Sequence, residues 1–76
     1  MSKSNVLLEA AIAEYEGQRK KAIAHLAIIC QRPVGIGEHT DLVDEINKWT
    51  VALSEAEDKI ATIRKNYLEI MTPING

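Results

Sequence analysis

The most distinctive short motif of this sequence is GIGEHT, which runs from Gly35 to Thr40. Glycines before a helix can leave backbone N–H groups open to an anion, and the helix dipole favours negative charge there. Arg32 and His39 could add positive charge, so an anion or nucleotide contact is one interpretation. The other is a helix–helix turn in which Gly35 and Gly37 supply positive φ and Thr40 caps the next helix. Without a third glycine or a following lysine, the motif matches neither a dinucleotide fingerprint nor a nucleotide-hydrolase phosphate loop.

A basic run, Arg19-Lys20-Lys21, precedes this motif in the sequence. Lys20 and Lys21 are candidates for additional contacts to an anion, although three adjacent charges are more often a solvated helix face. The whole chain carries nine Lys and Arg against eleven Asp and Glu, a formal net charge of −2. This balance argues against binding to bulk nucleic acid or to a membrane surface.

His25 and Cys30 are the other residues that could bind a metal or act as a catalytic pair. They lie about 140° apart around a helix, so they cannot share a metal ion without distortion. No acid is placed to orient a Cys–His pair, and we expect Cys30 to be buried and unreactive. We therefore expect no enzymatic activity, no cofactor and no metal site, and we interpret His25 as a hydrogen-bonded interface histidine.

The composition indicates one all-α domain spanning residues 1–76. Apolar residues make up 46% of the chain, aromatic residues only 4%, and there are four Gly and two Pro, too few for a small β-barrel or β-sandwich. Pro33 predicts the end of a first helix over about residues 5–31, followed by a loop at 32–39. A second helix is expected over about 40–71, ending before Pro73. Gly17 leaves open whether the first helix is broken there.

The predicted second helix carries a long apolar seam at alternating spacings of four and three residues, typical of a coiled coil. Its members are Leu42, Ile46, Trp49, Leu53, Ala56, Ile60, Ile63, Tyr67 and Ile70. We expect a continuous helix in which Ile46, Leu53, Ile60 and Ile63 are buried. The first helix has a rougher seam, interrupted by Arg19: Leu8, Ile12, Tyr15, Arg19, Ala22, Leu26 and Ile29. A short connection makes the two helices an antiparallel hairpin.

The segment 22–30 is apolar on nearly every side, which one partner helix cannot cover. A lone hairpin of this size buries too little apolar surface, and its single cysteine cannot form an intrachain disulfide. We therefore predict a homo-oligomer, most simply a dimer that forms an oligomeric helical bundle. The expected interface residues are Ile23, Leu26, Ile29 and Trp49. Trp49 is most simply a core residue, but a base or a partner could also stack on it.

The cysteine usage and the start of the chain predict a cytoplasmic protein. One cysteine gives no sign of an oxidising compartment, and the first residues do not look like a secretory signal. No stretch approaches 18 uncharged apolar residues, so we expect no membrane span.

The run RPVGIGEHTDLV, residues 32–43, resembles a pattern of short, uncharacterised tailed-bacteriophage proteins in which a P-V-G-[IV]-G-E-H segment joins two helices. The second helix of such proteins often continues through a stretch like Ala56-Glu57-Asp58-Lys59, and the likeness covers about residues 20–68. In size and architecture alone, the chain is also similar to phage hairpin proteins that oligomerise and sequester nucleotide signals of host immunity. It lacks the motifs of the anti-CBASS and anti-Thoeris sponges.

The resemblance implies a phage-type binding protein, which would act in the host cytoplasm. The most specific hypothesis is a host-defence antagonist that sequesters an anionic nucleotide. The residues that would bind it are Arg32, the Gly35 and Gly37 amides, His39, and Lys20 or Lys21. The alternative is a helical interaction module, with no small ligand, that docks on a host or phage protein as an inhibitor, adaptor or assembly factor. A virion or assembly component is a third class.

Overall fold

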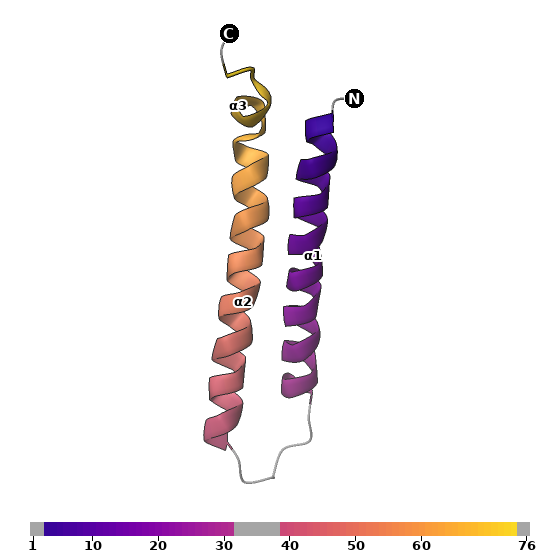
Figure 1. Ribbon diagram of the computed structural model, residues 1–76. Coiled ribbons are helices and arrows are strands. Elements are labelled where there is room, and N and C mark those ends of the chain that lie inside the picture. Colours follow the sequence, from indigo (N-terminus) through magenta and orange to yellow (C-terminus); the bar gives the residue numbers. More distant parts are fainter. Residues whose placement is uncertain (1–2, 32–38, 75–76) are drawn as a thin grey trace.

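A computed structural model describes residues 3–31 and 39–74 of the chain. Two long helices, α1 (Lys3–Cys30) and α2 (His39–Lys65), lie side by side and antiparallel as a hairpin (Figure 1). A short helix, α3 (Tyr67–Met71), follows α2. The described residues contain no strand, and their backbone measures 62 × 17 × 12 Å. The predicted all-helical hairpin is therefore confirmed.

α1 is continuous through Gly17, which answers the question that the sequence left open. A Cβ atom built on Gly17 would have no neighbour within 4 Å, so this glycine is not needed for close packing inside the hairpin. The helix begins two residues earlier than expected, at Lys3, and Gln31 adds a last turn through its N–H bond to the Ala27 carbonyl (2.9 Å). Differences of this size are usual at helix ends.

The prediction of one continuous helix over residues 40–71 is wrong at Asn66. Its backbone dihedral angles, φ −104° and ψ 14°, lie outside the helical region. The Asn66 side chain donates from Nδ2 to the Thr62 carbonyl (2.8 Å), a local bond of the kind by which asparagine competes with regular helix. α2 also begins at His39, one residue before the predicted start, so the backbone of Thr40 lies inside its first turn.

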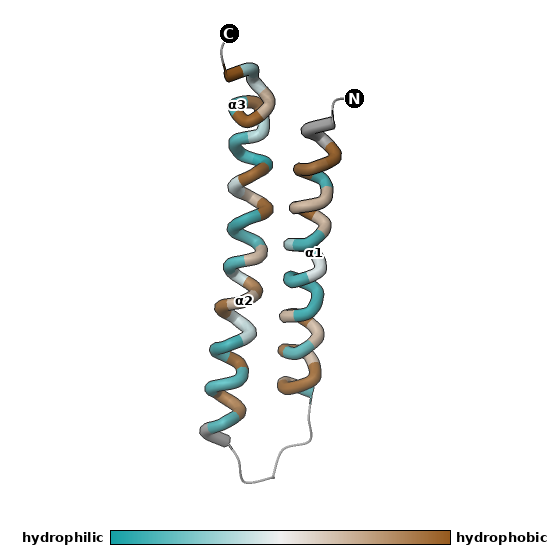
Figure 2. The backbone as a smooth tube through the Cα atoms, in the orientation of Figure 1, coloured by the Kyte–Doolittle hydropathy of each residue, from teal (hydrophilic) through white to brown (hydrophobic). Residues whose placement is uncertain are grey.

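The contact between α1 and α2 is narrower than the apolar seams suggest. Among the residues whose burial is described, the buried side chains are Ala22, Ala56 and Ile60, which are 0%, 1% and 5% exposed. Ile46, Leu53 and Ile63, which we expected to be buried, are only half-buried. Two helices can cover only one stripe of each other, and the larger side chains at the edge of that stripe keep part of their surface in water. Figure 2 shows the hydrophobic residues distributed along both helices.

Cys30 is exposed, which corrects the expectation that it would be buried. It is the last residue of α1. The apolar segment 22–30 therefore remains partly uncovered in the single hairpin, with Ile23 41% exposed and Ile28 62% exposed.

Candidate functional site

An aromatic pair, Trp49 of α2 and His25 of α1, joins the two helices towards the loop end of the hairpin. The two rings are parallel, at an interplanar angle of 2°, and their centroids are 3.9 Å apart. The antiparallel pairing of the helices brings these distant residues together, and both side chains are half-buried. Our interpretation of His25 as an interface histidine is consistent with this position, although its contact is ring stacking.

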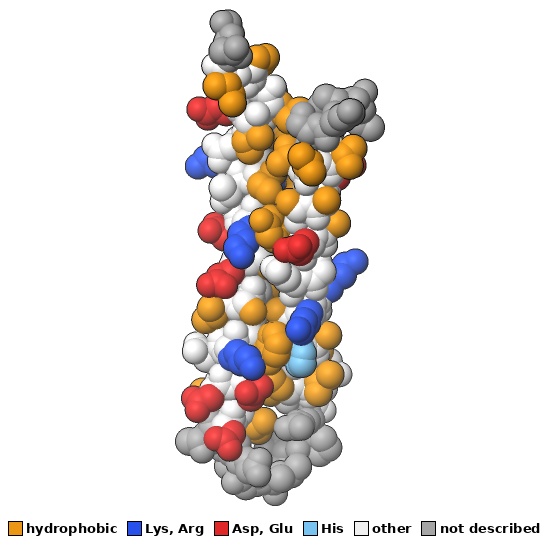
Figure 3. Space-filling model, viewed as in Figure 1, with side chains coloured by type: hydrophobic (Ala, Val, Ile, Leu, Met, Phe, Trp, Pro, Cys, Tyr) orange, Lys and Arg blue, Asp and Glu red, His pale blue; other side chains and the backbone are white. Residues whose placement is uncertain are grey.

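Two lysines surround the Trp49 ring. The Nζ atom of Lys48 lies 5.1 Å from the ring centroid and that of Lys21 lies 5.9 Å from it, both within cation–π range. Neither lysine forms an ion pair with a carboxylate among the described residues. Figure 3 shows basic side chains beside the histidine and a hydrophobic surface at this part of the hairpin. The cluster thus combines an aromatic surface with two positive charges that form no ion pair within the described part of the chain.

The indole Nε1 of Trp49 is buried and has no hydrogen-bond partner among the described residues. A buried donor without an acceptor costs about 1–3 kcal/mol. Within the described residues, the contacts of the ring are therefore stacking on His25 and the two lysines rather than a hydrogen bond. A shallow recess beside it is lined by Gln18, Lys21, Trp49, Ala52, Glu55 and Lys59.

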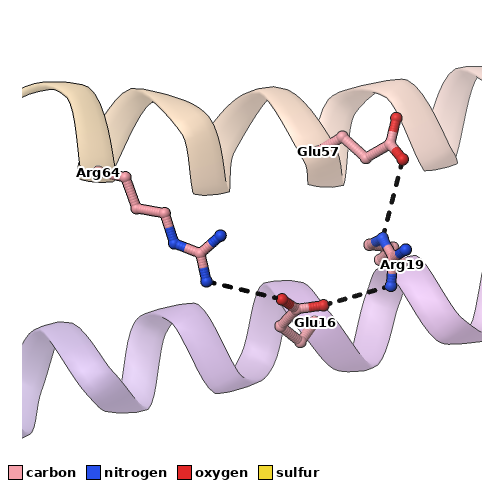
Figure 4. Close-up of polar contacts among 4 residues, drawn as sticks. All are labelled: Glu16, Arg19, Glu57 and Arg64. Carbon is pink, nitrogen blue, oxygen red and sulfur yellow. Dashed lines mark ion pairs between the residues drawn. The ribbon is translucent and has the colours of Figure 1, made fainter.

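A second polar cluster, in the middle of the hairpin, was not found from the sequence. Arg19 pairs with Glu16 (3.5 Å) on its own helix and with Glu57 (3.7 Å) of α2, while Arg64 reaches Glu16 from α2 (4.0 Å) (Figure 4). The interruption of the first seam by Arg19 was the signal for it, because a charge at a seam position requires a partner on the facing helix.

These four charges cancel, so the groove that they line with Ile60 and Ala61 offers an anion little net attraction. All four side chains are at least one-third exposed, and pairs of this kind contribute about 0–1 kcal/mol each. We conclude that the cluster helps to fix how α1 and α2 are aligned.

The predicted anion site lies largely outside the described residues. This applies to Arg32, Gly35 and Gly37, and also to the side chains of His39 and Thr40, whose backbone forms the first turn of α2. Lys20 is exposed, and Lys21 is the one predicted ligand contact that the structure brings to an aromatic ring. The site as a whole stays a prediction.

The predicted oligomer-interface residues occupy different environments. Leu26 and Ile29 share the helix face of Ala22, which points towards α2, and both are half-buried. Ile23 is exposed beside this face, and Trp49 is half-buried against His25. Part of the predicted interface is thus used inside the hairpin, and its role between subunits stays a prediction.

The described residues contain no group of three or more His, Cys, Asp or Glu side chains that could hold a metal ion. In the same part of the chain, no helix has both the length and the apolar character needed to span a membrane. Comparisons with models of protein families, with curated proteins and with solved structures found no match to this chain.

Proposed function

We propose that this protein is a non-enzymatic helical binding protein that works as a homo-oligomer. The observation that carries the proposal is the large apolar surface that the single hairpin leaves in water. Val6, Leu7, Ile28, Val43 and Leu68 are each more than 60% exposed. Isolated exposed apolar residues are normal, but so many on a chain of 76 residues indicate a surface that is covered in the working state.

The total surface area supports self-association. The chain exposes 6127 Å², whereas a compact monomer of its mass, 8.4 kDa, would expose about 4600 Å². The difference of about 1500 Å² exceeds the roughly 800 Å² that each partner contributes to a standard interface. The core of the described residues consists of two alanines and one isoleucine, which is also a weak basis for stability in a chain whose single cysteine is free.

The stoichiometry tests this proposal directly. We expect sedimentation and native mass spectrometry at micromolar concentration to give a dimer or a larger oligomer. Ile29→Asp should dissociate or unfold the protein, because it places an unpaired charge in apolar surroundings. A folded monomer of 8.4 kDa at these concentrations would refute the oligomer.

The second part of the proposal concerns the ligand. The cluster of Trp49, His25, Lys21 and Lys48 supports an anionic, ring-containing ligand such as a nucleotide, since stacking and cation contacts both favour one. Trp49 is about 14 Å along the helix axis from Thr40, so a ligand near the start of α2 could approach both. Together with the resemblance to phage proteins, this favours a host-defence antagonist that sequesters a nucleotide signal.

Calorimetric titration with cyclic nucleotides tests the ligand. We expect binding that weakens with added salt, because part of the attraction is between exposed charges. Arg32→Ala/His39→Ala should abolish the heat of binding while leaving the circular dichroism spectrum and the oligomer unchanged. Lys65→Ala, at an exposed lysine at the far end of α2, is the control and should leave the heat of binding unchanged. No heat with any nucleotide on the oligomeric wild type would favour the alternative, an interaction module that docks on a host or phage protein.

A further inference from the structure

The outer side of α1, which faces away from α2 in Figure 1, carries a second apolar stripe. Its members are Val6, Ala10, Ala13, Gly17, Ala24 and Ile28, all of them exposed. Their spacings of three, four and seven residues place them on one helix face. At about 100° per residue, this face lies roughly opposite the one that carries the buried Ala22. We call it the outer stripe.

The outer side of α2 is different. Its matching positions are Asp44, Asn47, Val51, Ser54, Asp58, Thr62 and Lys65. α2 is therefore an ordinary amphipathic helix with one apolar face and one polar, solvent-exposed face. α1, by contrast, is apolar on two opposite faces. A helix with two opposite apolar faces is normally covered on both of them. The face that needs a partner is thus on α1.

We propose that the outer stripe binds the same stripe of a second copy, with the two α1 helices antiparallel and Gly17 at the two-fold axis. The inference rests on the proposed self-association and adds the face through which it occurs. The order of side chains along the outer stripe supports a second copy of this chain as the binding partner. Three pairs of residues lie at equal distances on the two sides of Gly17. The distance is eleven residues for Val6 and Ile28, seven for Ala10 and Ala24, and four for Ala13 and Lys21.

This near-symmetry gives a self-complementary contact. A two-fold axis at Gly17 sets Val6 against the partner's Ile28 and Ala10 against the partner's Ala24, and every contact occurs twice. The small residues in the middle allow the helix axes to approach to the lower end of the usual range, about 8 Å. Gly17 has no contact of its own within the hairpin, so the space at its Cα is free for the partner helix.

Charge complementarity supports the same arrangement. Glu14 and Lys21 flank the outer stripe on one side, and neither has an ion-pair partner among the described residues. In an antiparallel pair centred on Gly17, Glu14 lies alongside the partner's Lys21, so that symmetry produces two ion pairs. Lys48 is then the lysine of the Trp49 cluster that this contact does not use. In this dimer, both α1 helices lie in the centre and the polar faces of the α2 helices lie on the outside.

Cysteine trapping tests the geometry. In a Cys30→Ser background, Gly17→Cys places two thiols at the two-fold axis. Helix axes about 8–10 Å apart bring the two Cα atoms within the reach of a disulfide. We expect most of this variant to form a covalent dimer under mild oxidation. Ser54→Cys, on the exposed outer face of α2, is the control and should remain largely uncrosslinked.

Charge substitutions test the energetics by sedimentation equilibrium. Ala24→Glu should weaken the dimer about 100-fold or more, because it buries two unpaired charges, and Ala61→Glu at an exposed position of α2 should not. Glu14→Lys and Lys21→Glu should each weaken the dimer, and the double variant should recover most of the loss.

The outcomes separate this inference from the proposal on which it rests. An oligomer that Ala24→Glu leaves intact, and in which Gly17→Cys crosslinks no faster than Ser54→Cys, would overturn the outer stripe as the interface but not the oligomer. A monomeric wild type would overturn both.

Discussion

Ile60 is the largest buried side chain in the described part of the chain, so Ile60→Ala is the sharpest test of the contact between α1 and α2. The change removes three carbons from a side chain that is 5% exposed. At about 0.8 kcal/mol for each buried CH₂ group, the lost transfer free energy is about 2.4 kcal/mol. A residual cavity adds to this value, up to a total of about 4 kcal/mol.

The matched control is Leu68→Ala, which also removes three carbons but from a side chain that is 81% exposed. It should lower the free energy of unfolding by less than about 0.5 kcal/mol. Urea unfolding followed by circular dichroism at several protein concentrations would measure both, since self-association makes stability depend on concentration. Equal losses for the two variants would refute the packing described for α2.

Three further substitutions test other contacts. Leu53→Ala should lower the free energy of unfolding by about 1–2 kcal/mol, between the values for Ile60→Ala and Leu68→Ala, because Leu53 is only half-buried. A loss under about 0.5 kcal/mol in the same urea experiment would show that the apolar seam of α2 is misassigned. Trp49→Phe should change the free energy of unfolding by less than about 1 kcal/mol, since the smaller ring loses contact area but also removes the unpaired Nε1 donor; a loss above about 2 kcal/mol would mean that this donor has a partner. Arg19→Gln should cost at most about 1 kcal/mol, and the difference from wild type should shrink in 1 M salt; a cost that salt leaves unchanged would contradict the ion-pair account.

The helices and their pairing could be predicted because they follow from local signals. Pro33 predicts an end of the first helix close to Cys30, where α1 ends, and the four-three spacing of apolar residues identifies the face that carries Ala56 and Ile60. The break at Asn66 was missed because the apolar spacing continues across it through Ile63 and Tyr67. The only local signal was the asparagine itself, whose side chain competes for the Thr62 carbonyl.

The candidate site was harder to predict because its parts come from different helices. The stack of His25 on Trp49 depends on how α1 is aligned along α2, and that alignment cannot be read from either helix alone. The same holds for the ion pair between Arg19 and Glu57. By contrast, Lys21 was visible in the sequence as part of a basic run, although the sequence did not connect it to an aromatic ring.

The interruption at Asn66 has a consequence for how the chain opens locally. α3 has no buried residue, and its end is held by exposed bonds such as that from the Thr72 hydroxyl to the Leu68 carbonyl (2.6 Å). Short segments with few buried contacts open at a much lower free energy than the rest of a fold. Amide protons of α3 should therefore exchange with solvent long before those near Ile60. The residues after Asn66 would then fray and reform while the paired helices stay closed.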